Sequence, residues 1–198
     1  MFKRNKLMAF VGIIGLGGSL LAPLTAEAHC DTHAGPTYEA LQNAIEENDF
    51  NHISYWVLPD SEAELKSTFD TTMSVMSKTE DEETLQLAED YLFENFVRLH
   101  RAGEGAPYTG ISDEAVDEGV ALADQSITAE SLQPLEDGGF ITDENRTHVE
   151  AVFATLLERI DFDVEDTEAG RAYVESYVEF THLFESGHAE DVEHHEGH

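Results

Sequence analysis

Apolar positions recur three and four residues apart along most of the chain, which is the spacing of amphipathic helices. Strand-like alternation is missing after residue 28, so the sequence predicts an all-α fold. One helix is expected over residues 60–78, opening with Ser61 and Glu64 at capping-box spacing. A second helix is expected over residues 82–101, stopping at the loop that starts with Gly103.

The two halves of the chain resemble each other. Residues 91–100 align with residues 173–182, and each stretch begins with Tyr and ends with His. Residues 64–69 align with residues 148–153 in a similar way. Helical composition alone can imitate part of such a match, but the pattern favours an internally duplicated helical unit.

A duplicated unit would give repeat halves of about residues 37–110 and 111–185. Each half would hold two long helices and short ones, and four long helices pack most simply as a bundle around a pseudo-twofold axis. His100 and His182 would then occupy equivalent positions near the ends of their helices.

The first 28 residues have the pattern of a secretory leader. A basic segment at residues 3–6 precedes an apolar run over residues 7–21, and Ala26-Glu27-Ala28 is a small-x-small cleavage site. The run is short for a bilayer span, which needs ~20 apolar residues. We therefore expect cleavage after Ala28, a periplasmic or secreted location, and no membrane attachment afterwards.

The mature chain is expected to form one helical-bundle domain over residues 29–185, followed by a disordered tail over residues 186–198. The tail carries four histidines among acidic residues. Clustered imidazoles can gather copper, nickel or zinc weakly, which would suit metal buffering. The alternative is a solvated tail in which histidines are scattered among charges.

Acidic residues dominate the composition. The chain has 42 Asp and Glu against 10 Lys and Arg, a formal charge of −32, and loss of the leader would make it −34. Nucleic acid and anionic lipid headgroups would be repelled. The 41% of hydrophobic residues are sufficient for a packed core. The excess charge by itself indicates an acidic surface suited to high salt, and a metal-free scaffold protein is one interpretation.

The predicted mature N-terminus is the most specific candidate for a functional site in the sequence. Cleavage would place a free amine beside the imidazole of His29, and Cys30 adds a thiol. Mixed nitrogen and sulfur donors suit copper, nickel or zinc. Cys30 is the chain's single cysteine, so it has no partner for a disulfide within the chain. The alternative to a metal site is that the leader is cut by coincidence beside a histidine and a cysteine that have no such role.

The start His29-Cys30-Asp31, followed by Gly35 and Tyr38, resembles the nickel hook of nickel superoxide dismutase, a helical-bundle enzyme. The resemblance covers about ten residues. It implies that the amine and imidazole of His29 and the backbone nitrogen and thiolate of Cys30 are the metal ligands. It also implies superoxide dismutation as a candidate reaction.

The segment departs from that hook at three places. His33 stands where the proline would be, Ala34 replaces the second ligand cysteine, and Tyr38 comes one position late. The loss of one thiolate argues against dismutation, because both thiolates tune the nickel couple in that enzyme. Copper or zinc could replace nickel, and His33 is an additional candidate ligand.

A second resemblance covers nearly all the mature chain. The His-Cys-Asp start, the loop over residues 100–110 and the helix over residues 173–182 resemble a family of small exported bacterial proteins without an established function. This resemblance implies export and one helical domain. It also suggests that the N-terminus, His100 and His182 belong to one site.

Two further groups could bind a metal. His100, Arg101 and Glu104 could supply an imidazole, a guanidinium and a carboxylate, although they would equally suit a helix C-terminus. Glu179 and His182 have the Glu-x-x-His spacing of carboxylate-bridged di-iron bundles. The first half lacks the matching pair, which argues against a di-iron centre.

Phosphate-binding loops, serine-hydrolase elbows and zincin motifs are absent from the sequence. We therefore expect an exported protein that binds a transition metal, with copper or nickel favoured and zinc possible. The sequence leaves open a superoxide dismutase-like metalloenzyme, a periplasmic metal carrier or buffer, and a metal-free acidic scaffold. Self-association into a homo-oligomer is also left open.

Overall fold

The computed structural model describes residues 29–112 and 115–185, so the predicted leader and the histidine-rich tail lie outside the described residues. Helices dominate, and the β-structure in the described ranges is one isolated parallel bridge between Thr32 and Ser112. The all-α prediction is confirmed. A short 3₁₀ turn η1 (His29–Asp31) precedes α1 (Pro36–Glu47), α2 (Asn51–Ser54), α3 (Pro59–Met76), α4 (Glu82–Glu104), α5 (Glu118–Thr128), α6 (Gln133–Asp137), α7 (Arg146–Leu157) and α8 (Thr167–His182).

The helices predicted over residues 60–78 and 82–101 are α3 and α4, with two differences at their ends. The predicted capping box is wrong: α3 begins at Pro59, whose fixed φ suits the first helical position, and no side chain caps it. The predicted stop at Gly103 is also wrong. Helix α4 continues to Glu104 and ends where Gly105 adopts a left-handed φ of 74°.

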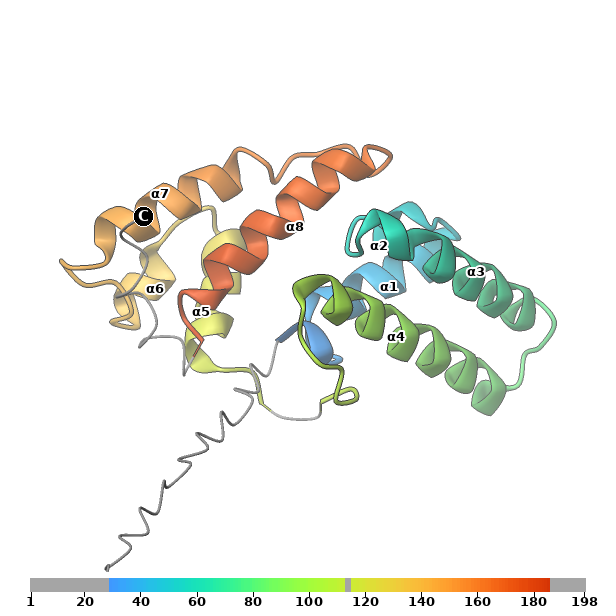
Figure 1. The fold of residues 1–198 in the computed structure, drawn as a ribbon. Coiled ribbons are helices and arrows are strands. Elements are labelled where there is room, and N and C mark those ends of the chain that lie inside the picture. The colour runs from blue at the N-terminus through green and yellow to red at the C-terminus, as the bar shows by residue number, and fades with distance from the viewer. Residues whose placement is uncertain (1–28, 113–114, 186–198) are drawn as a thin grey trace, which may run out of the picture.

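The helices are arranged as two sets, with α1–α4 on one side of the molecule and α5–α8 on the other (Figure 1). In the first set α3 packs on α4, while α1 contacts α2, α4 and η1. In the second set α7 packs on α8, and α5 contacts α6 and α8. Each set therefore runs through two shorter helices and then a hairpin. The internal duplication itself stays a prediction.

Buried apolar side chains from both sets form a continuous core. Several aligned positions of the two halves lie in it: Leu65 and Val149 are both buried, as are Phe69 and Phe153. Beside this core the C-terminal end of α4 faces η1 and α8, and it buries the polar residues His100 and Arg101. In the described ranges, no helix is long and apolar enough to cross a membrane.

Candidate functional site

The N-terminal turn over residues 29–31 is buried and tied down by hydrogen bonds. The carbonyl of His29 accepts from the Thr32 hydroxyl at 3.1 Å, and the carbonyl of Cys30 accepts from the Thr37 hydroxyl. The carbonyl of Asp31 accepts from the backbone N–H of Ser112 at 2.9 Å. Gly35 permits the tight turn, because a Cβ there would lie 2.2 Å from the His29 carbonyl oxygen. The turn is therefore a fixed part of the fold.

The ring of His29 reaches across to the second helix set. Its Nε2 lies 2.6 Å from Asp124 Oδ2 on α5. The other carboxylate oxygen of Asp124 accepts from the hydroxyl of Tyr177 on α8 at 2.7 Å. The Nδ1 atom of His29 is buried and has no hydrogen-bond partner among the described residues. One ring nitrogen is thus fixed by a carboxylate and the other is open.

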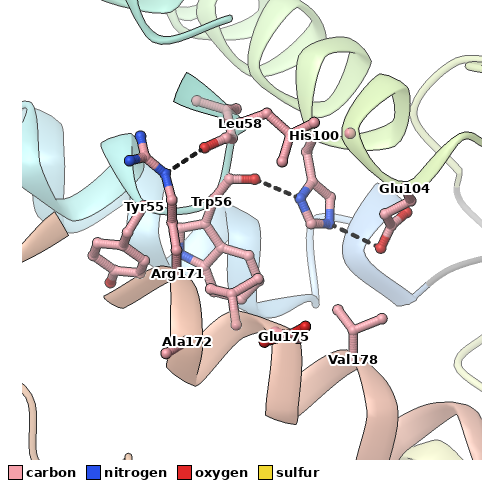
Figure 2. Close-up of a pocket in the computed structure, with 12 residues that line it drawn as sticks. Tyr55, Trp56, Leu58, His100, Glu104, Arg171, Ala172, Glu175 and Val178 are labelled. Carbon is pink, nitrogen blue, oxygen red and sulfur yellow. Dashed lines mark hydrogen bonds and ion pairs between the residues drawn. The ribbon is translucent and has the colours of Figure 1, made fainter. Parts of the chain in front are cut away.

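The ring of His100 on α4 is also fixed at one nitrogen. Its Nδ1 lies 2.7 Å from the carbonyl oxygen of Trp56, and because a carbonyl only accepts, Nδ1 carries the hydrogen (Figure 2). Its Nε2 faces Glu104, with 3.4 Å between Nε2 and Oε1, and the Cys30 thiol is a second neighbour. This Nε2 is buried and forms no hydrogen bond of good geometry with the residues that the structure describes.

The cluster around His100 combines acidic and basic groups that are largely shielded from water. Arg101 lies 3.3 Å from Asp31 and 3.1 Å from Glu104, measured between nitrogen and carboxylate oxygen. Both Asp31 and Arg101 are almost fully buried. Such charges are stable in the interior only when opposite charges and hydrogen bonds compensate them.

The pKa values of this cluster follow from burial and from the neighbouring charges. Burial raises the pKa of the Cys30 thiol, and His100 offsets only part of that increase. Burial alone would lower the pKa of His100, but Cys30 and Glu104 raise it well above its ordinary value. Burial would raise the pKa of Glu104, but His100 and Arg101 lower it. Burial raises the pKa of Asp31 to about 6, against the opposing effect of Arg101.

The end of α8 approaches the same cluster. His182, whose side chain is one-third exposed, lies close enough to Glu104 to lower the pKa of that carboxyl. The buried side chain of Glu185 contributes to the raised pKa of Asp31. The structure therefore gathers Cys30, His100 and Glu104, with His182 at the margin.

Two other predicted candidates lie elsewhere. His33 is exposed, and its ring packs against Tyr38 and Phe93 with centroid distances of 4.8 and 5.1 Å. Glu179 is exposed on α8. Across residues 29–112 and 115–185, no three His, Cys, Asp or Glu side chains form a group that could hold a metal ion.

Three residues of the site were missed by the sequence analysis. Asp124 and Tyr177 fix the ring of His29, and the backbone carbonyl of Trp56 fixes the ring of His100. Asp124 is one acidic residue among 42 Asp and Glu and stands in no motif. Its role depends on the packing of α5 beside η1, which no local pattern reveals.

A cavity of about 480 Å³ lies beside the cluster. His100, Gly103 and Glu104 of α4 form one side of it, residues 55–58 form a second side, and α8 forms a third (Figure 2). The lining is mainly apolar and aromatic. A small molecule in this cavity would lie against the His100–Glu104 pair.

The fold and the site define an all-helical protein with a buried cluster of cysteine, histidine and acidic side chains. The chain belongs to DUF6448, a family of unknown function, which it matches over residues 34–183. This range contains His100, Glu104 and His182 and begins after Cys30. Comparisons with curated proteins and with solved structures give no match.

Proposed function

We propose that the protein is exported, loses residues 1–28, and binds one transition-metal ion at its new N-terminus. The ligands would be the amine and imidazole of His29, the thiolate of Cys30 and Nε2 of His100. The observation that carries this proposal is the orientation of the two imidazoles. Each has one ring nitrogen fixed by an oxygen acceptor. Nδ1 of His29 is buried without a hydrogen-bond partner among the described residues, and Nε2 of His100 is buried beside Glu104 and the Cys30 thiol.

Metal-binding histidines characteristically have one ring nitrogen held by an oxygen acceptor. A ligating imidazole usually donates its remaining N–H to a carboxylate or a backbone carbonyl, which fixes the ring orientation and the tautomer. Asp124 would do this for His29, and the Trp56 carbonyl would do it for His100. Burying Nδ1 of His29 without a partner is unfavourable unless something binds it.

Side chains of the described residues form no three-donor group for a metal ion, and an N-terminal histidine would add a donor that no side chain supplies. The α-amine and Nδ1 of His29 can close a six-membered ring on one ion, and Nδ1 is the nitrogen that is open. The amine arises only when residues 1–28 are removed. The proposal therefore makes leader cleavage a requirement for tight binding, with Cys30 adding the thiolate.

The donor set favours copper or nickel and also accepts zinc, because nitrogen and thiolate ligands suit these ions. A thiol, an imidazolium or an ammonium group must lose a proton before it can bind the ion, so affinity should fall as the pH falls. With copper or nickel the site would be redox-active, and superoxide is the small oxidant to assay first. A carrier role is the alternative outcome if metal is bound without turnover.

The test compares matched mature chains that start at His29 and lack residues 186–198, so that tail imidazoles do not bind metal. One version carries a single extra Ala before His29, and others carry Cys30→Ser or His100→Gln. A His148→Ala variant is the control, since His148 is exposed on α7. Each protein is incubated with copper, nickel or zinc, passed through a desalting column and measured for metal content.

We expect about one ion per chain in the native-start protein and in the His148 variant, with a thiolate-to-metal absorption band for copper or nickel. The extra Ala should lower affinity strongly, because it converts the amine into an amide. Cys30→Ser should abolish the charge-transfer band. Equal metal content in the native-start and Ala-extended proteins would contradict the proposal.

A further inference from the structure

The cavity beside His100 has the features of a ligand-binding site and shares only His100 with the proposed metal ligands. Its volume of about 480 Å³ falls within the ~300–1,000 Å³ usual for small-molecule pockets. It lies between the two helix sets, since residues 55–58 and α4 come from the first set and α8 comes from the second. Most of its wall is apolar or aromatic, including Trp56, Val57, Leu58, Val174 and Val178.

The charged groups of the cavity are already compensated. Arg171 donates to Glu62 at 2.7 Å and to the carbonyl of Val57 at 2.9 Å. Glu104 is paired with His100 and Arg101. Glu175 lies 3.8 Å from Arg159, and its side chain is 79% exposed to solvent. A charged ligand would lose its hydration on entry without gaining an unpaired counter-charge, so the cavity favours an uncharged molecule.

Two lining residues have buried polar atoms without a hydrogen bond of good geometry among the described residues. The indole N–H of Trp56, a residue that is 5% exposed, forms no hydrogen bond of good geometry with the described residues, and the Tyr55 hydroxyl lies near it. Oε1 of Glu104 has no donor of good hydrogen-bond geometry there. A ligand with an apolar body and one hydroxyl, carbonyl or amine group would satisfy one of these atoms while its body covers the valine side chains.

We propose that this cavity binds a small, uncharged, mainly apolar organic molecule of one or two ring systems with a single hydrogen-bonding group. The site goes beyond metal binding and needs no metal, so its test uses metal-free protein. Failure of metal binding and failure of this proposal are therefore distinguishable.

The chain provides its own reporter, because Trp56 is its single tryptophan and lines the cavity. The probe is N-phenyl-1-naphthylamine, an uncharged two-part aromatic amine that accepts energy from tryptophan and brightens in apolar sites. Its sulfonated counterpart, 1-anilinonaphthalene-8-sulfonate, has the same rings and a negative charge. Both are titrated in about 1 M salt, where the Debye length is ~3 Å and the net charge of the protein is screened.

We expect saturable binding of the uncharged probe at about one per chain, with energy transfer from Trp56, and at least ~tenfold weaker binding of the sulfonate. Ala172→Phe and Val178→Phe both place a ring into the cavity, and each should weaken the uncharged probe by about tenfold or more. Leu87→Ala is the control, since Leu87 is 69% exposed on α4, away from the cavity lining.

Three results would overturn the proposal: no saturable binding by the native protein, equal affinity for both probes, or unchanged affinity in both filled variants. Loss of binding in Leu87→Ala would also overturn it, because the probe would then be on the exposed surface of α4. Circular dichroism of each variant confirms that the helices are retained, and two independent filling positions guard against a variant that does not fold.

Discussion

The contact of Gly170 with Tyr55 gives a sharp test of how the two helix sets meet. Gly170 is buried in the first turn of α8. A Cβ at this position would lie 2.6 Å from Cγ and 2.7 Å from Cβ of Tyr55, and 2.9 Å from a ring atom of Phe162. Cβ of Tyr55 is fixed to the backbone and cannot move aside by a change of rotamer. Gly170→Ala should therefore force α8 away from the segment that lines the cavity.

Two opposing effects set the size of the change. Alanine is better than glycine inside a helix by about 1 kcal/mol. Overpacking a buried site costs typically ~1–3 kcal/mol, and contacts this short with a rigid atom place Gly170 at the upper end of that range. The net expectation is a loss of about 1–2 kcal/mol in the free energy of unfolding.

Gly103→Ala is the matched control, because it makes the same substitution inside α4. A Cβ there would meet only Leu58, at 3.2 Å from Cγ, and Leu58 is 52% exposed and free to turn. The helical preference should dominate, giving a change between zero and a gain of about 1 kcal/mol. Urea unfolding of the metal-free proteins, followed by circular dichroism, measures both. A Gly170→Ala protein as stable as the native one would refute the close packing of α8 on Tyr55.

Three further predictions concern the site and its neighbours. Asp124→Asn should weaken metal binding by ~10–100-fold in a chelator competition, because the His29 ring loses its fixing carboxylate; Asp70→Asn on the surface of α3 should have no effect. Gly35→Ala should lower both the melting temperature and metal content, because its Cβ would collide with the His29 carbonyl; unchanged metal content would contradict the placement of the N-terminal turn. The hydrogen bond from Tyr38 to Glu89, at 2.7 Å, is the largest cause that raises the pKa of Tyr38 to about 12. Since this pKa is raised on folding, the stabilisation is complete below the ordinary value of 10 and is lost as pH rises through about 12. Glu89→Gln should bring the titration of Tyr38, followed by NMR, back toward 10, and an unshifted titration would exclude this hydrogen bond.

The helices could be predicted from the sequence because their signal is local. The apolar spacing along α3 and α4 gives their positions to within a few residues. The exact ends of these two helices depend on which of several nearby residues occupies the terminal position. Pro59 starts α3 ahead of the polar pair at Ser61 and Glu64, and Gly105, two residues beyond Gly103, supplies the left-handed cap of α4.

Only part of the site could be predicted from local sequence patterns. His29 and Cys30 follow from the cleavage pattern, and the candidates His100 and Glu104 share one helix end. Asp124 meets His29 across a long sequence separation, and the Trp56 carbonyl is a backbone group that no side-chain pattern identifies. His33 shows the opposite case: its position in the N-terminal segment suggests a ligand, but its ring packs between Tyr38 and Phe93.

The central claim is tested most directly on the naturally exported protein, by intact mass and elemental analysis of the same sample. The account predicts a chain that starts at His29 and carries about one copper, nickel or zinc ion, which is lost in His29→Ala. A chain that starts at His29 but stays empty after incubation with each of the three metals would contradict it.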